Sequence, residues 1–218
     1  MVDALGNGVS SSPSTSQSQR GGAFPTFTIA DMVETQYRLL TAVLGLRHLH
    51  AIVGISMGGM QVFEWAIAHP DFMDKAVSIV GSPQTQPDDR QRWMESVLWV
   101  RQPVWTRAGR MLLRLKPRTA VNELLMKPWN HIRQAEAVMG FDIARGFEGS
   151  LERAAMAIRA ELMVASTWQD REVNPGPAFE VARMIQAEVL ELDGRCGHQA
   201  PACERAVLWP AVARFLDR

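Results

Sequence analysis

The pentapeptide Gly54-Ile55-Ser56-Met57-Gly58 constrains the fold of this chain more than any other feature. It lies between an apolar, β-prone run over 49–55, which is typical of a strand buried on both faces, and a helical pattern over 58–68. A strand that turns directly into a helix forces the middle residue into a strained conformation, and glycines on either side keep neighbouring atoms from colliding. This context predicts that Ser56 projects its hydroxyl above a sheet. The alternative is a small-residue turn that only packs a helix on a strand.

Strand and helix patterns alternate on both sides of this turn. Thr28 and Asp31 form a capping box at the start of a helical stripe that ends at Gly45. Further strands are predicted over 76–80, 161–166 and 189–192, and further helices over 179–187 and 203–216. Because parallel strands are joined by helical crossovers, this order predicts an α/β fold with a parallel sheet flanked by helices.

Residues 84–158 interrupt the alternation. They contain four of the seven tryptophans, their periodicity is helical, and no run in them is typical of a buried strand. We interpret this stretch as an inserted helical cap. The cap divides the chain into a first core part (1–83) with the strand-to-helix turn, the cap itself (84–158) and a second core part (159–218).

Two further residues complete a candidate catalytic group with Ser56. Asp170 follows the predicted strand 161–166, and His198 follows the next strand, at the sheet edge where parallel α/β folds gather their sites. A serine hydroxyl needs a base to take its proton and an acid to orient that base. The alternatives are a loop-turn or helix-cap role for Asp170, the competing carboxylate of Glu172, and a surface role for His198. The amide of Met57, at the helix start, is the predicted oxyanion donor.

Composition excludes several other functions. The chain has 218 residues with 23 basic and 23 acidic side chains, so no net charge recruits nucleic acid or an anionic membrane. No run approaches the roughly 20 apolar residues of a bilayer crossing. Only two cysteines occur, Cys196 and Cys203, and they lack metal-ligand spacing. We therefore expect a cytoplasmic protein without a metal or a cofactor, in which Cys196, near His198, serves in packing and not as a second nucleophile.

Three segments resemble the homoserine O-acetyltransferase group of α/β-hydrolase-fold proteins: 3–8, 24–33 and 54–66. The third is the most specific, because generic esterases rarely carry its S-M-G-G-M-Q and E-W-A runs. The resemblance extends over 2–83 and, more weakly, over 160–201. It implies an α/β-hydrolase fold in which Ser56 is acylated, Asp170 is the acid and His198 is the base. An acyl donor would esterify the serine, and an alcohol or water would then take the acyl group.

Two departures from the group concern the acceptor. Homoserine-acetylating members typically have an Asp after the catalytic His, which pairs with the substrate amine, whereas this chain has Gln199. Their cap typically holds a Tyr-Arg-Ser/Thr motif whose Arg meets the substrate carboxylate, whereas the only tyrosine here is Tyr37, outside the predicted cap. These departures predict that homoserine is a poor acceptor. A carboxylic-ester hydrolase, in which water alone takes the acyl group, is the alternative enzyme.

The resemblance also bears on the N-terminus. If 2–5 is the end of a strand, the family pattern implies that the N-terminal strands and the loop with the second oxyanion donor are missing. We then expect a sheet of four to five strands, with 49–55 at or next to an edge, and a chain that aggregates or forms a homodimer. A non-catalytic remnant of the fold is a further alternative.

Residues 90–118 hold eight basic side chains and one acidic side chain, and part of this stretch has amphipathic spacing. Such a helix is either a solvated lid or a surface for an anionic donor such as acyl-CoA.

Overall fold

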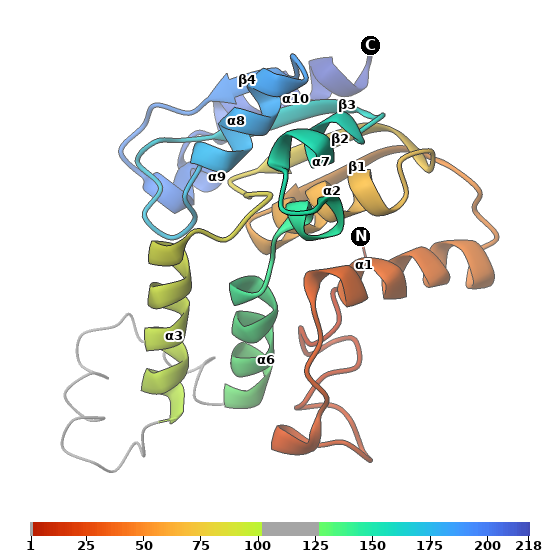
Figure 1. The fold of residues 1–218 in the computed structure, drawn as a ribbon, viewed down its shortest axis with the longest axis vertical. Coiled ribbons are helices and arrows are strands. Elements are labelled where there is room, and N and C mark those ends of the chain that lie inside the picture. The colour runs from red at the N-terminus through yellow and green to blue at the C-terminus, as the bar shows by residue number, and fades with distance from the viewer. Residues whose placement is uncertain (1, 102–126) are drawn as a thin grey trace.

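The computed structural model describes residues 2–101 and 127–218 (Figure 1). The strands are β1 (Leu49–Ile55), β2 (Met73–Ile79), β3 (Glu161–Ser166) and β4 (Glu188–Glu191). They lie side by side in chain order, and each neighbouring pair is parallel. The predicted parallel sheet is confirmed, and within the described residues β1 lies at an edge of it, as expected.

Helices connect and cover these strands. The helices are α1 (Ile29–Arg38), α2 (Met57–Ala68), α3 (Pro87–Arg101), α6 (Pro128–Met139), α7 (Leu151–Met156), α8 (Gly176–Met184), α9 (Ala200–Cys203) and α10 (Arg205–Leu216). A π-helical turn, Leu39–Val43, continues α1, and short 3₁₀ turns occur at Gly21–Ala23, Ile143–Phe147 and Gly197–Gln199. Within the described residues, every helix is too short or too polar to cross a bilayer.

The capping box at the start of α1 is confirmed. The Asp31 amide donates to Thr28 Oγ1 over 3.1 Å, and the Thr28 amide donates to Asp31 Oδ2 over 2.8 Å. Met32 and Val33 then point inward and are buried in the core that α1 shares with α2. The capped helix thus supports α2, which carries the strand-to-helix turn.

Alternate residues of β3 face two hydrophobic clusters, one on each side of the sheet. Leu162 and Val164 pack into the cluster that includes residues of α1, α2 and α8. Met163 and Ala165 pack into the cluster formed with α10. Because successive side chains of a strand point to opposite faces, β3 contacts helices on both faces of the sheet. This explains its near-continuous apolar sequence.

The expectation that the run 49–55 is buried on both faces is wrong. Leu49 and Ile52 pack against the core, but Val53 and Ile55 remain 44% and 45% exposed. The reason is position: β1 pairs only with β2 in the described part of the chain, and the α10 cluster draws its strand residues from β2, β3 and β4.

The interpretation of residues 2–5 as a strand end is also wrong. This segment has no strand pairing and leads into a loop in which the Gly6 amide donates to the Ser11 carbonyl over 2.9 Å. The loop packs on α6, where the Ser14 amide donates to Asn130 Oδ1 over 2.9 Å and Gln134 Nε2 donates to the Gly6 carbonyl over 3.0 Å. Side chains of α6 fix this loop in place of a sheet.

The described residues of 84–158 are mainly helical. Helices α3 and α6 run side by side below the sheet in Figure 1 and share a small apolar cluster that includes Val97, Val100, Ile132 and Ala135. Most of the basic stretch 90–118 lies outside the described residues. The three-part division of the chain stays a prediction.

Candidate active site

Ser56 occupies the strained turn between β1 and α2 that the pentapeptide predicts. Its φ is 56° and its ψ is −118°, a combination that L-residues rarely adopt. Its amide donates to the Ile79 carbonyl over 2.8 Å, which ties the turn to the end of β2. The turn therefore holds the serine above the carboxyl edge of the sheet.

Of the two glycines that flank Ser56, only Gly54 has the expected role. A Cβ on Gly54 would lie 2.1 Å from the Gly58 carbonyl oxygen, so this glycine is required. A Cβ on Gly58 would meet nothing within 4 Å, so the expectation of a collision there is wrong. The close approach lies one residue later, since a Cβ on Gly59 would lie 2.9 Å from Gly81 Cα. The pair of adjacent glycines at 58 and 59 is the sequence signal for this contact.

The structure brings Ser56, His198 and Asp170 together. Ser56 Oγ lies 2.7 Å from His198 Nε2, and His198 Nδ1 lies 2.7 Å from Asp170 Oδ2. Each residue follows a different strand of the sheet: β1, β4 and β3. With the imidazole proton on Nδ1 and donated to Asp170, Nε2 is left to accept the serine proton. The geometry is that of a nucleophile, a base and an orienting acid.

Asp170, and not Glu172, is the acid that faces the imidazole. The Asp170 side chain is completely buried. Its Oδ1 accepts from the amides of Glu172 and Val173 over 2.8 and 3.0 Å, which leaves Oδ2 for His198. The loop-turn alternative for Asp170 is thus also present, because one oxygen accepts from two amides of the following loop while the other holds the imidazole.

The surroundings of His198 set its basicity. Burial lowers the pKa of His198, but the hydrogen bond and charge of Asp170 and the charge of Glu172 raise it more, so that the pKa lies above the ordinary 6.5. The side chain is 12% exposed. A largely buried imidazole on a buried carboxylate fits the acid and base roles of acyl transfer.

Met57 and Gln199 flank the central pair. Met57 is the first residue of α2, so its amide belongs to the first turn, where donors lack an intrahelical acceptor and the helix dipole is positive. Gln199 follows His198 directly, is exposed, and stands at the N-cap of α9. Their roles in binding an oxyanion and a substrate stay predictions.

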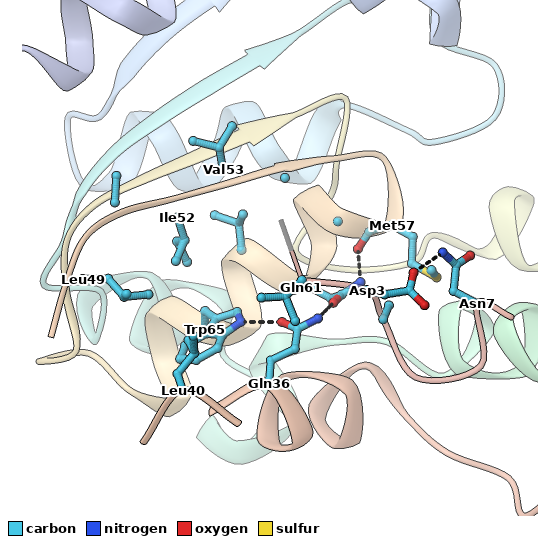
Figure 2. A pocket seen from close by; sticks show the side chains of 16 residues that line it. Asp3, Asn7, Gln36, Leu40, Leu49, Ile52, Val53, Met57, Gln61 and Trp65 are labelled. Carbon is cyan, nitrogen blue, oxygen red and sulfur yellow. Dashed lines mark hydrogen bonds between the residues drawn. The ribbon is translucent and has the colours of Figure 1, made fainter. Parts of the chain in front are cut away.

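A groove runs along the open edge of β1 and extends to Gly54, Met57 and Gly58, which flank Ser56. It is lined by residues of β1, α2, α1 and the N-terminal loop. Figure 2 shows a chain of hydrogen bonds in its wall: Trp65 Nε1 donates to Gln36, Gln36 Nε2 donates to Gln61, and Gln61 Nε2 donates to the Met57 carbonyl. This chain connects α1 to the residue that carries the candidate oxyanion amide.

Sequence reasoning missed a polar contact that supports the Asp170 loop. Asp89, in the first turn of α3, is buried and accepts from the Asn174 amide over 3.0 Å and from the Arg92 guanidinium. The contact joins α3 to the loop after β3. Paired acidic residues at a helix start signal a cap, but the partner 85 residues away has no local signal.

The expectation that a cysteine serves only in packing is wrong. Cys196 and Cys203 form a disulfide across the segment that contains His198. The spacing of seven residues gave no indication of this, because the bond depends on how the loop after β4 turns back. Within residues 2–101 and 127–218, no three potential ligands gather into a metal site.

Comparison with known proteins agrees with this geometry. Residues 1–105 match the alpha/beta hydrolase fold family. The chain is 29% identical to a probable acyltransferase of Methanothermobacter thermautotrophicus, over 90% of this chain and 68% of that protein. It is 41% identical to an ethyl acetate hydrolase of Pseudomonas veronii, over 41% of this chain and 26% of that protein. It is 42% identical to a homoserine O-acetyltransferase of Methanosalsum zhilinae, over 31% of this chain and 13% of that protein.

Solved structures share the fold over nearly the whole chain. The acetyl esterase MekB superposes with a TM-score of 0.81 at 24% identity, covering 98% of this chain and 75% of that one. A homoserine O-acetyltransferase from Bacillus anthracis superposes with a TM-score of 0.75 at 22% identity, covering 91% and 67%.

The chain has the α/β-hydrolase fold. Its homologues include acyltransferases, homoserine O-acetyltransferases and ester hydrolases, so the resemblance stated from the sequence is confirmed. The sequence matches to the last two classes span well under two thirds of those proteins.

Proposed function

We propose that the protein transfers acyl groups through an ester on Ser56. The observation that carries the proposal is the pair of 2.7 Å contacts from Ser56 to His198 and from His198 to Asp170. His198 takes the hydroxyl proton as Oγ attacks the acyl carbonyl, and the Met57 amide donates to the developing oxyanion. His198 then protonates the leaving group, and an alcohol or water attacks the acyl-enzyme by the reverse steps.

The substrates that we propose are small esters or thioesters, with acyl-CoA as one candidate donor, and no resident cofactor is needed. Gln199 argues against homoserine as acceptor, because the side chain after the base is uncharged. A carboxylic-ester hydrolase is the second candidate, supported by the ethyl acetate hydrolase among the relatives. Parallel assays with and without an acceptor alcohol separate transfer from hydrolysis.

Labelling with a serine-directed fluorophosphonate, followed by peptide mass analysis, tests the proposal. We expect one adduct, on Ser56, and none in the Ser56→Ala variant. Ser82→Ala is the matched control, because Ser82 is buried and its hydroxyl donates to the Gln84 carbonyl. If the folded chain is labelled at another residue or not at all, the proposal fails and the non-catalytic remnant is favoured.

We also propose a cytoplasmic location and self-association along β1. Val53 and Ile55 are exposed on an edge strand that carries no charged or proline residue, and such edges pair with other chains. In sedimentation experiments, the apparent molecular mass should rise with protein concentration. The Val53→Lys variant should show a smaller rise. Fractionation of native cells tests the location.

A further inference from the structure

The base of the candidate site lies in a loop that is closed by a disulfide. Cys196 directly precedes the 3₁₀ turn Gly197–Gln199, and Cys203 is the last residue of α9. The bond joins residues seven positions apart, with their Cα atoms 6.5 Å apart. His198 therefore sits inside the small ring that this bond closes.

Besides the disulfide, the loop is held by the hydrogen bonds of His198 to Ser56 and Asp170 and by Ala200, which is buried in the α10 cluster. Its two helical turns have three and four residues, too few to be stable on their own. At its start the Gly194 amide donates to Glu204 Oε1 over 3.1 Å. Gly197 has a φ of 53° and packs closely on the Gln169 carbonyl. The disulfide is the one covalent restraint within the segment from β4 to α10.

The disulfide is within reach of a soluble thiol. Cys203 is exposed and Cys196 is partly exposed, so a thiolate can approach a sulfur from solvent. Cytosolic disulfides are commonly transient and serve redox sensing or catalysis. In the cytoplasmic location proposed above, the state of the pair would follow the thiol pool.

We infer that the Cys196–Cys203 disulfide is a redox-controlled positioning element for His198, and that a dithiol switches it. A dithiol reduces the pair by thiol–disulfide exchange: the cystine gains two electrons and two protons to give two thiols, and the dithiol becomes a cyclic disulfide. The reduced loop loses its ring, and His198 loses its fixed distance to Ser56. The inference rests on the proposed acylation of Ser56.

A small displacement of His198 is enough to slow the reaction. A misplacement of about 1 Å in a catalytic group costs roughly 10²-fold in rate. Loosening the ring should therefore slow labelling of Ser56 by about tenfold to a hundredfold, while the sheet and its core stay intact.

The first arm of the test detects the disulfide and its effect on the loop without an activity assay. Peptide mapping of protein purified without reductant, with free thiols alkylated first, should recover one peptide pair joined through Cys196 and Cys203. Hydrogen exchange of the segment 194–204 should then speed up after dithiothreitol, with β3 unchanged. Two alkylated thiols in the untreated protein, or unchanged exchange, would overturn the inference.

The second arm reads the chemistry. Fluorophosphonate labelling should slow on reduction and recover on reoxidation, and the midpoint of its pH profile should fall as His198 separates from Asp170 and Glu172. The Cys196→Ser/Cys203→Ser double variant should match the reduced protein and be indifferent to dithiothreitol. Equal labelling rates in both redox states would overturn the inference, even if reduction changed the midpoint of thermal unfolding.

The two arms separate this inference from the proposed function. If the oxidised protein itself does not label, acylation of Ser56 fails, and hydrogen exchange alone then decides whether the disulfide holds the loop. If the double variant does not fold, the dithiol titration of the wild-type chain still gives both readouts.

Discussion

His198 Nδ1 lies 2.7 Å from Asp170 Oδ2, and the other oxygen of the same carboxylate is held by two backbone amides of its own loop. The carboxylate is thus fixed before it meets the imidazole. A fixed, buried acceptor selects the tautomer with the proton on Nδ1, and this tautomer is the one that can accept a proton from Ser56.

Asp170→Asn should leave the chain folded and lower the rate of Ser56 labelling by about 10⁴-fold, as in other serine–histidine–aspartate sites. The asparagine oxygen can still accept from the two loop amides. Its NH₂ group then faces His198 Nδ1 and favours the tautomer that cannot act as base. Stopped-flow labelling measures the rate, and Glu172→Gln is the matched control. A loss of less than tenfold would show that Asp170 does not orient the base.

The pH dependence of labelling should follow the neutral form of His198. The pKa of His198 lies above 6.5 because Asp170 and Glu172 stabilise its cation against the opposing effect of burial. The labelling rate should therefore rise with pH through a midpoint above 6.5. The stabilising ion pair acts oppositely: it is complete below pH 6.5 and is lost as pH rises through the folded-state pKa. A midpoint at or below 6.5 contradicts this assignment.

Homoserine should be a poor acceptor, because Gln199 offers no charge to its ammonium group. A charge-assisted contact contributes about 1.5–3 kcal/mol, so its absence weakens discrimination roughly 10- to 150-fold. Gln199→Asp should improve transfer from acetyl-CoA to homoserine. Gln199→Asn should not, because asparagine has the size of aspartate but no charge. Efficient, saturable transfer to homoserine by the wild-type chain would refute the prediction.

The sequence predicts the positions of Ser56, Asp170 and His198 because each depends on local order. Each residue follows a strand, and parallel strands bring their carboxyl ends to one edge of the sheet. The same logic predicts β1 to β4 within a few residues.

Features that depend on distant partners were predicted wrongly or missed. Residues 2–5 look like a strand, but a strand needs a neighbour, and α6 instead holds the loop that follows them. The run 49–55 looks buried, but its exposure depends on what lies beside β1. The disulfide required the return of the chain between Cys196 and Cys203, which spacing does not reveal.

Gly54 and Gly58, four residues apart in one motif, should respond in opposite ways to alanine. A Cβ on Gly54 would lie 2.1 Å from the Gly58 carbonyl oxygen and 2.3 Å from its carbon. Both atoms belong to the backbone of α2, so the turn must shift to admit the methyl group. Gly54→Ala should therefore destabilise the chain by about 1–3 kcal/mol or more, and it should slow labelling of Ser56 because the turn that holds the serine moves.

A Cβ on Gly58 meets nothing within 4 Å, and glycine inside a helix costs up to about 1 kcal/mol relative to alanine. Gly58→Ala should therefore leave the stability unchanged or raise it by up to that amount. At about 2–4 °C per kcal/mol for a chain of this size, thermal melting resolves the two variants. Equal losses in both would mean that the turn needs two glycines for a reason other than the contact between Gly54 and the Gly58 carbonyl.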